Sequence, residues 1–505
     1  MTEQTQQESI ADENVSVSEE NLLDNLLSKV DRSMKRPDSY VTIEDAIKQD
    51  TSAARISHAV DYLVKSVLES NTKIDKLDKQ MIDSVIESLD TKISDQLNEI
   101  IHNEKFQELE SAWRGLKFAI DRTNFRSNIK VEMLNCSKEK LLEDFEDNSL
   151  FDSGLYKQLY KKEYDTPGAD PFSFIVTNFE FKNIAPDISL LHSISKVSSA
   201  THCPCFSSVG SEFFGKKKME ELASINDINE IFTTTEYAKW NTFRETEDSR
   251  YIGLTMNKFL LRMPYGPETD KVKGFNFIED AKGEAENYLW GNPSFALMSN
   301  LNRSFTQNGW TVRIRGVESG GKVANLPLHT FQGLSGAQSR NPAEITIEDT
   351  TEFDLSENGF IPLCPYKNKD FCVFQSVHSA QKPKKYDDPD ATANAALPAN
   401  LPYMLLVSRL AHYLKVIQRK VIGSQKGREE LEKELNNWIQ GLVTTQTNPT
   451  QETIAKYPLA SASVEVTPSP GKPGFYHVSM KVKPHFQVEG VNIDLSLVSR
   501  MPSKK

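Results

Sequence analysis

Strict alternation of apolar and polar residues marks the end of the chain, from Pro458 onward. Successive alternating runs are separated by turns rich in proline and glycine. Their apolar members are Ala460, Ala462, Val464 and Val466, then Tyr476, Val478, Met480 and Val482, and finally Val491, Ile493, Leu495 and Leu497. A period of two residues is typical of strands with one buried and one solvent-exposed face, so we expect a small antiparallel sheet at the C-terminus.

A small sheet at a chain end leaves at least one strand edge without a partner. An open edge invites unwanted pairing, and some proteins use such an edge to accept a strand from another protein. The alternative is a meander whose edge folds against the body of its own chain. The periodicity by itself does not decide between these two structures.

Residues 1–53 are predicted to be a polar, disordered arm that contains one short amphipathic helix. Ser16 and Glu19 match a capping box at its start. Its apolar stripe consists of Leu22, Leu23, Leu26, Leu27 and Val30. So short a helix is marginal in water, so we expect it to dock on its own chain or in the groove of a partner.

Helical periodicity continues through residues 54–125, as is typical of helices that pack against one another within a chain. Residues 126–375 are expected to form a mixed α/β domain. In it, a strand over Phe172–Thr177, a helix over Ile188–Val197 and a strand over Cys205–Val209 make a plausible βαβ unit. Further expected elements are a strand over Trp310–Arg315 and a hairpin of Phe360–Leu363 with Phe371–Phe374.

Residues 376–400 contain few large apolar side chains and are predicted to be an exposed linker. The last region, residues 401–505, begins with helices over Tyr403–Ile422 and Arg428–Leu442 and ends with the small sheet. The predicted fold class is therefore α+β or mixed α/β, with an N-terminal helical region, a central α/β domain, and C-terminal helices plus a small antiparallel sheet.

Net charge and the distribution of apolar residues limit the kinds of partner and location that we expect. The 505 residues carry 59 Lys and Arg against 71 Asp and Glu, a net charge of −12, which argues against nucleic acid or an anionic membrane as the main partner. No apolar run is long enough to span a bilayer, and the polar segment Met1–Glu20 does not resemble a signal peptide. We therefore expect a cytoplasmic protein that is not embedded in a membrane.

Candidate chemistry is sparse. Five cysteines are an odd set typical of reduced thiols, and the Cys203–Cys205 spacing does not suit zinc. Gly316–Val323 matches a phosphate-binding loop except that Val323 replaces the serine or threonine that ligates magnesium. Gly333–Ala337 resembles the nucleophile elbow of hydrolases, but Pro342 would cut short the helix that must follow. We expect no catalytic residue, cofactor or metal.

Several separate stretches, in order along the chain, resemble the large subunit of the type VI secretion contractile sheath, the TssC/VipB family, with IglB as the most similar variant. They are His102–Leu116, Leu261–Gly266 with Tyr288–Asn292, Trp310–Gly321, Ser408–Lys415 and Pro484–Gly490. The resemblance implies a contractile-tail-sheath-like fold and a structural protein of the bacterial cytoplasm, within an envelope-anchored assembly for protein secretion and virulence. Departures lie mostly in the first fifty or so residues, between Ser211 and Arg250, and in the linker.

The resemblance also implies partners. A small sheath subunit (TssB/VipA, or IglA) forms an obligate heterodimer with the large subunit, and further copies polymerise into a helical cylinder around an inner tube of an Hcp-like protein. The cylinder starts at a baseplate, contracts to expel the tube, and is disassembled by an AAA+ ATPase. Strands exchanged between subunits hold it together, and the N-terminal helix is the ATPase site in some members.

These expectations give candidate site residues. The strand-exchange set is Val464, Val466, Tyr476, Val478, Met480, Val482, Val491, Ile493 and Leu495, and the helix-docking set is Leu22, Leu23, Leu26, Leu27 and Val30. Trp113, Arg114 and Gly115 are expected to be a buried ring, a cation near a helix end and a left-handed stop. Arg409, His412 and Tyr413 share a helix face and are expected to form buried structural hydrogen bonds.

Two other functions stay open on the sequence alone. One is a cytoplasmic hydrolase or nucleotide-binding enzyme that uses the central α/β domain. The other is a scaffold that binds helices without polymerising. Tubes formed with the small subunit would distinguish the sheath from both.

Overall fold

The computed structural model describes residues 79–485, apart from residues 226, 268, 270–274, 276, 282, 334–335, 422–426, 445, 447–448 and 469–475. The predicted N-terminal helix and the predicted strand over Val491–Leu497 lie outside this part. The chain divides into two compact units, Met1–Ile101 with Tyr265–Glu279, and His102–Pro264 with Asp280–Lys505. In the first unit, α4 (Lys79–Ile101) confirms the helical periodicity seen in this stretch of sequence.

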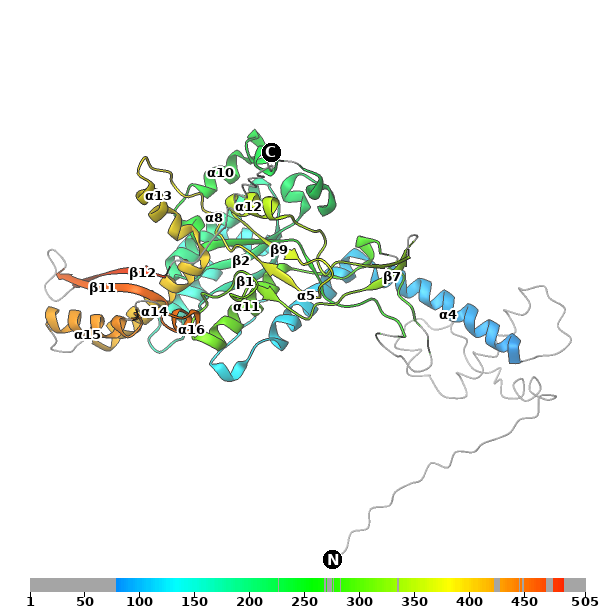
Figure 1. The fold of residues 1–505 in the computed structure, drawn as a ribbon, viewed down its shortest axis with the longest axis horizontal. Coiled ribbons are helices and arrows are strands. Elements are labelled where there is room, and N and C mark those ends of the chain that lie inside the picture. The colour runs from blue at the N-terminus through cyan, green and yellow to red at the C-terminus, as the bar shows by residue number, and fades with distance from the viewer. Residues whose placement is uncertain are drawn as a thin grey trace, which may run out of the picture. The chain divides into compact units, whose positions relative to one another are not determined.

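The second unit is built around a six-stranded sheet with strand order β1-β2-β3-β9-β10-β6 (Figure 1). Its strands are β1 (Ile175–Phe181), β2 (Cys205–Val209), β3 (Ile252–Met256), β9 (Phe360–Pro365), β10 (Cys372–Phe374) and β6 (Lys322–Val323). Pairing is parallel from β1 to β9 and antiparallel from β9 through β10 to β6. Helix α8 (Ala185–Thr201) joins β1 to β2, which confirms the βαβ unit, and β9 with β10 confirms the hairpin.

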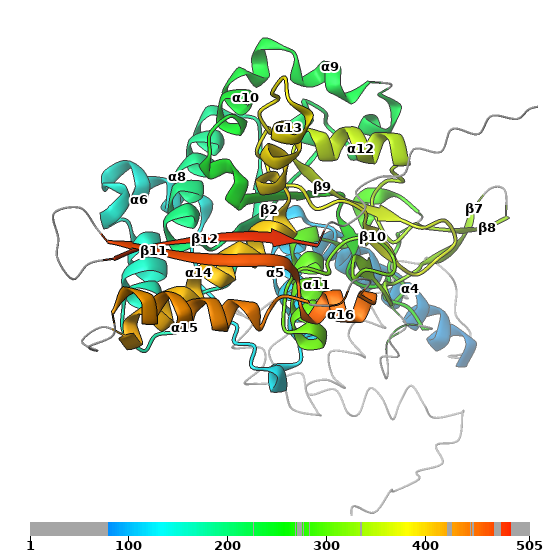
Figure 2. The same ribbon diagram turned by 60° about the vertical axis from the view of Figure 1, so that its left-hand side comes forward.

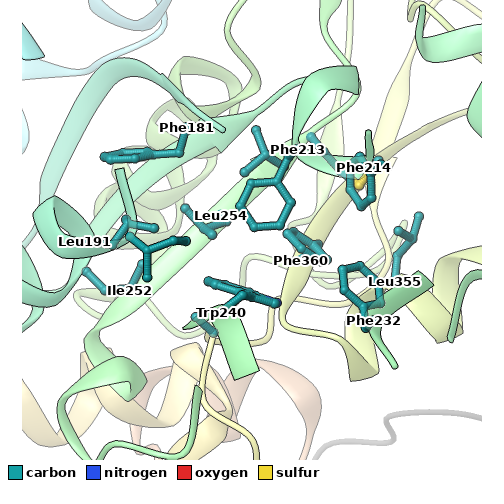
Figure 3. Packing of buried hydrophobic residues seen from close by; sticks show 14 of the residues in the cluster. Phe181, Leu191, Phe213, Phe214, Phe232, Trp240, Ile252, Leu254, Leu355 and Phe360 are labelled. Carbon is teal, nitrogen blue, oxygen red and sulfur yellow. The ribbon is translucent and has the colours of Figure 1, made fainter. Parts of the chain in front are cut away.

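Strands β2, β3, β9 and β10 are buried along their whole length, as is usual inside a largely parallel sheet, whereas the edge strand β1 is mostly half-buried. Neighbouring residues of one strand enter different cores: Phe360 joins one with Trp240 of α10 (Ala238–Arg244), and Ile361 joins another with Leu297 of α11 (Pro293–Asn308). Figure 3 shows the first core, in which the Trp240 and Phe360 rings stack with centroids 5.6 Å apart. The sheet is thus sandwiched between two packed layers.

The remaining elements of this unit cover the sheet or extend from it. The helices are α5 (Glu104–Asp121), α6 (Lys138–Asp147), α7 (Gly154–Tyr156) with a π-helical turn over Lys157–Tyr164, α9 (Ile228–Phe232), α12 (Asp349–Glu357), α13 (Pro389–Ala396), α14 (Leu401–Val421), α15 (Arg428–Gln440) and α16 (Gln451–Lys456). Two-stranded pieces are β4 (Phe259–Leu260) with β5 (Trp290–Gly291), β7 (Thr330–Gly333) with β8 (Gly336–Ser339), and β11 (Leu459–Pro468) with β12 (Tyr476–Pro484). Helices α14 and α15 and strands β11 and β12 confirm the elements predicted after residue 400.

The strand predicted over Trp310–Arg315 is wrong. The segment forms no strand, and Arg315 makes an isolated bridge to Gly320. The N–H of Arg313 donates instead to the hydroxyl of Ser304 at 3.1 Å. Burial does not follow the alternation of the sequence, because Thr311 and Arg315 are buried as well as Trp310 and Ile314, while Val312 is only half-buried.

The linker predicted over residues 376–400 is not exposed throughout. Val377 and Ala380 are fully buried, and the Ala380 N–H donates to the Ile252 carbonyl at 2.8 Å. Helix α13 then occupies the later part of the segment. Small side chains at the start of the segment can pack closely against β3. A low content of large apolar residues therefore did not indicate an exposed linker here.

Candidate assembly interface

The C-terminal hairpin packs on α15 through two adjoining stripes of that helix. Leu431, Leu435 and Ile439 recur every four residues and are buried in one core with Val464 and Val466 of β11. The residue after each of them is polar, which gives a second stripe of Glu432, Asn436 and Gln440. Because both stripes run along the helix, α15 can follow the strand with its apolar side under the sheet and its polar side at the strand edge.

The polar stripe hydrogen-bonds to the backbone at the outer edge of β11. Asn436 donates from Nδ2 to the Val464 carbonyl at 2.7 Å and accepts from the Val464 N–H at 2.9 Å. Gln440 donates to the Ala462 carbonyl at 2.8 Å, and Glu432 accepts from the Val466 N–H at 3.3 Å. The side chains thus take the positions of a neighbouring strand, so the β11 edge is sealed.

The outer edge of β12 is different. Val464 is paired with Met480, and both backbone groups of Val464 face α15, so this pair cannot be a hydrogen-bonded pair of the ladder. The N–H and C=O of Met480 therefore point away from β11, and the same alternation applies to Val478 and Val482. Figure 2 shows β12 on the side of β11 away from α15. No backbone group of the described chain pairs with this edge.

Most of the described strand-exchange candidates lie together in the structure, but they pack into a core and do not form an exposed surface. Val464 and Val466 are buried, and Val478, Met480 and Val482 are half-buried against the same core. Tyr476 is apart from them and 39% exposed. The remaining candidates, Val491, Ile493, Leu495 and the helix-docking set Leu22, Leu23, Leu26, Leu27 and Val30, lie outside the described residues. Among the described residues, the apolar face of the hairpin is thus used mostly internally, and the backbone groups of the β12 edge are available to a partner.

Glu432, Asn436 and Gln440 were not among the residues predicted from the sequence. Their signal was present, because a polar residue follows each buried residue of α15 at the same spacing. In the sequence alone, such a stripe cannot be distinguished from the solvent-exposed face of a helix, because the strand edge that it contacts is distant in sequence.

The expectations for Trp113, Arg114 and Gly115 are partly wrong, because these residues lie within α5 rather than at its end. Trp113 is 59% exposed, and Gly115 is helical instead of left-handed. A Cβ at Gly115 would lie 2.6 Å from the ring of Phe295, so the glycine permits a close crossing of α5 with α11. Arg114 pairs with Glu110 one turn earlier, at 2.6 Å.

The buried hydrogen bond expected on α14 is present for His412, whereas those of Arg409 are part-buried or exposed. His412 is buried with Nε2 2.9 Å from the Thr201 carbonyl, and burial lowers the pKa of its imidazole to about 4. Arg409 donates to Ser173 Oγ and to the Tyr413 hydroxyl. Tyr413 is 40% exposed, so it is only partly a core residue. These contacts fasten α14 to the end of α8 and to the segment before β1.

The glycine-rich loop that resembles a phosphate-binding loop is bound by the protein itself. Arg303 donates to the carbonyls of Gly320 and Lys322, at 2.8 and 2.7 Å, and the Gly321 N–H donates to Gly316. The chain then enters strand β6 instead of a helix. The nucleophile-elbow candidate likewise falls on the β7–β8 hairpin, so a strand follows it instead of the helix that the elbow needs.

The described residues do not support a metal site, a reactive buried cysteine or a membrane-spanning helix. In the part of the chain that the structure describes, no three His, Cys, Asp or Glu side chains gather closely enough for a metal ion. Burial raises the pKa of the Cys205 thiol to about 12, which leaves it protonated and unreactive. None of the described helices is both long and apolar enough to cross a bilayer.

Comparison with known proteins gives the family. The VipB model, described as EvpB/VC_A0108, tail sheath N-terminal domain, matches residues 83–381, and its companion, the tail sheath gpW/gp25-like domain, matches residues 390–501. The type VI secretion system sheath protein TssC1 of Pseudomonas aeruginosa is 43% identical over 466 residues, which cover 91% of this chain and 94% of the relative.

Solved structures give more distant likenesses, at 10% identity. A chain of the anti-feeding prophage baseplate matches with a TM-score of 0.36 over 74% of this chain and 83% of that one. The contracted sheath of the same prophage matches with a TM-score of 0.30 over 62% and 68%. These matches do not bear on the IglB variant, which stays a prediction. The two family models and the TssC1 relative show that this chain belongs to the TssC/VipB family of type VI secretion sheath proteins.

Proposed function

We propose that this chain pairs with a small sheath subunit of the TssB/VipA type and that the heterodimers polymerise into a helical cylinder around an inner, Hcp-like tube. The cylinder grows from a baseplate in the bacterial cytoplasm, within an envelope-anchored assembly, and contracts to expel the tube. An AAA+ ATPase then disassembles it. The family assignment supports the sheath role, and the finer partners are part of the proposal.

The observation that carries this proposal is the difference between the two edges of the C-terminal hairpin. Subunits of a contracting polymer must stay linked while they rotate against one another. Backbone pairing at a strand edge gives such a link, because the connection to the rest of the subunit can flex. The β11 edge is sealed by α15, whereas the β12 edge directs the N–H groups of Val478, Met480 and Val482 outward.

The test uses the direction of these N–H groups. Met480→Pro removes an outward donor and leaves the β11–β12 bonds in place, whereas Ser479→Pro removes a donor inside the hairpin. Each variant is co-expressed with the small subunit and examined by electron microscopy. We expect Met480→Pro to give a folded heterodimer without tubes, and Ser479→Pro to lose the hairpin itself.

Met480→Ala is the control for loss of side-chain packing and should still form tubes. Protease resistance and heterodimer purification show whether each variant is folded. Tubes of normal length from Met480→Pro would show that this edge does not link subunits.

The N-terminal helix predicted around Leu22–Val30 is proposed as the docking site for the disassembly ATPase. Leu22→Glu with Leu26→Glu should impair the recycling of contracted sheath and leave assembly intact, as followed by fluorescence microscopy of labelled sheath. Loss of the heterodimer would instead place this helix in the subunit interface.

A further inference from the structure

We propose that the outer edge of β12 selects a strand of the small sheath subunit in which acidic and apolar residues alternate. In an antiparallel pairing, the carboxylates of this strand lie opposite Lys481 and Lys483, and its apolar residues extend the apolar face of β12. The identity of the partner rests on the proposed function, in which this edge links subunits. Charge then decides, together with backbone pairing, which strand the edge accepts.

The two faces of β12 carry different side chains. Val478, Met480 and Val482 are half-buried against the core that includes α15. Lys481 and Lys483 are exposed, and they point to the opposite face because side chains alternate along a strand. A strand added to β12 continues both faces of the sheet. Its apolar residues can therefore extend the core, and its other residues lie beside the lysines.

The lysines lie at positions where an added strand comes closest. The backbone groups of Met480 and its alternate neighbours point away from β11, so an antiparallel strand forms its hydrogen-bonded pairs with these residues. Lys481 and Lys483 then belong to non-hydrogen-bonded pairs, in which Cα atoms are about 4.5 Å apart instead of about 5.5 Å. The residues opposite the two lysines are therefore the most sensitive to charge.

Strand β11 does not place a carboxylate directly opposite either lysine. Lys481 is paired with Ser463, and Lys483 is paired with Ser461. Glu465 lies diagonally from Lys481, with its carboxylate 3.9 Å from Nζ, and both side chains are exposed. An exposed ion pair of this length contributes little, so Lys481 can also pair with a carboxylate of an added strand.

The lysines outweigh more distant charges at this edge. Because neighbouring strands are about 4.8 Å apart, an added strand lies beside β12 but about 10 Å from β11. Salt screens exposed charges beyond about 8 Å, so Glu465 and the net charge of −12 repel an acidic strand only weakly. The same lysines disfavour pairing between two β12 edges, which would bring the lysines of both chains onto one sheet.

The described strands of this chain do not supply such a partner strand. The pattern needs two carboxylates two residues apart, one for each lysine. Among the described strands, β1 carries Glu180 and β11 carries Glu465, but none has a second acidic residue two positions away. We therefore assign the strand to the small subunit and not to a second copy of this chain.

Charge changes in the full-length chain, co-expressed with the small subunit, test this selection. Lys481→Glu with Lys483→Glu turns two attractive cross-strand pairs into repulsive ones, so we expect a roughly tenfold lower yield of sedimentable tubes. Lys481→Arg with Lys483→Arg keeps both charges and should give the wild-type yield. A wild-type yield from the glutamate variant, together with loss of tubes in Met480→Pro, would overturn the charge selection and leave the proposed function intact.

A second variant guards against damage to the hairpin itself. The change at Lys481 introduces a carboxylate near Glu465, whereas Lys483→Glu alone faces Ser461 of β11. This single change should leave the protease resistance of the free heterodimer unchanged and still lower the tube yield about threefold. A normal tube yield from a folded Lys483→Glu variant would contradict the proposal.

A photo-reactive cross-linker attached to Ser479→Cys identifies the strand in assembled tubes. We expect the linked peptide to come from the small subunit and to hold two carboxylates, two residues apart, with apolar residues between and beside them. The chain without this change is the blank for its native thiols, of which Cys136 is half-buried and the others are buried. A linked peptide from a second copy, or a strand without the carboxylates, would overturn the proposal.

A charge swap completes the test. Lysine at the two acidic positions of the linked strand should restore tubes to the Lys481→Glu, Lys483→Glu variant, because both cross-strand pairs become attractive again. Absence of this rescue would overturn the charge selection. Absence of any link to another chain, together with tubes from Met480→Pro, would instead remove the proposed function of this edge.

Discussion

The strand edges of the central sheet and of the C-terminal hairpin are protected to different degrees. The central sheet is buried on both faces and ends on one side at the short strand β6. On the other side, β1 is interrupted by an irregularity between Val176 and Glu180, and Lys138 donates to the Glu180 carbonyl at that strand. Bulges and lysines are recognised ways to protect a sheet edge.

The β12 edge of the hairpin also carries lysines, Lys481 and Lys483, but its pairing with β11 is regular from Ser461 onward, without a bulge. The α15 side of the hairpin is sealed by side chains that replace a strand, and its other side presents regular backbone groups. We therefore expect the central sheet to be the stable frame of the subunit, and under the proposed function the links to other subunits form at the hairpin. Changes in the two regions should therefore have different consequences.

The largest loss of folding free energy is expected for a change in the core of the central sheet. Trp240→Ala removes a fully buried ring that packs on Phe213 and Phe360, and the cavity should cost about 3–5 kcal/mol of folding free energy. Trp113→Ala, at a residue that is 59% exposed, is the matched control and should cost less than about 1 kcal/mol. Thermal unfolding followed by circular dichroism measures both. Similar losses would mean that the frame is not centred on this core.

The next effect depends on pH and tests how α14 is held to the frame. The folded-state pKa of His412 is lowered to about 4, below the ordinary value near 6.5, so the unfolded chain binds a proton that the folded chain does not. Stability should therefore be complete above pH 6.5 and fall as the pH drops toward 4, by at most about 3 kcal/mol.

Denaturant unfolding of the wild type and of His412→Gln between pH 4 and 7 measures this. The variant should be less stable at pH 7 because it loses a packed ring, but its stability should fall less between pH 6.5 and 4. Burial also lowers the pKa of the nearby His202, so some dependence on pH should remain in the variant. Identical slopes would exclude His412 as a cause.

A smaller effect is expected at the sealed edge. Asn436→Ala leaves the N–H and carbonyl of Val464 without their partner, at a cost of about 1–3 kcal/mol, and opens the β11 edge. We expect earlier unfolding and more self-association in analytical ultracentrifugation. Asn437→Ala, at the exposed neighbouring position, is the control and should behave as the wild type. No difference between the two variants would mean that the β11 edge needs no seal.

The smallest effect is expected at the glycine-rich loop. Lys322 Nζ lies 4.1 Å from the centre of the Phe371 ring, and Lys322→Ala should cost about 1 kcal/mol or less through loss of this cation–π contact. Tube formation should be unchanged, and calorimetry should detect no ATP binding that depends on Lys322. Such binding would revive the nucleotide-binding alternative for the central domain.

The sequence by itself determined those elements whose pattern is local. Alternation over residues 460–482 predicted β11 and β12, and apolar spacing predicted α8, α14 and α15. These patterns succeed because the side-chain period of a strand or helix depends only on its own backbone. The candidate site was likewise predicted as a small antiparallel sheet, of which the described residues include β11 and β12, although its edges were not distinguished.

Tertiary structure alone decided where backbone and side chains find partners. Trp310–Arg315 alternates like a strand, yet its N–H groups bond elsewhere, and Trp113 is exposed within a helix instead of buried at its end. The seal on β11 also depends on Asn436, which is 28 residues from Val464 and meets it only in the folded chain. A hydrogen bond requires both partners to be within about 3 Å, and only the packing of distant segments determines that distance.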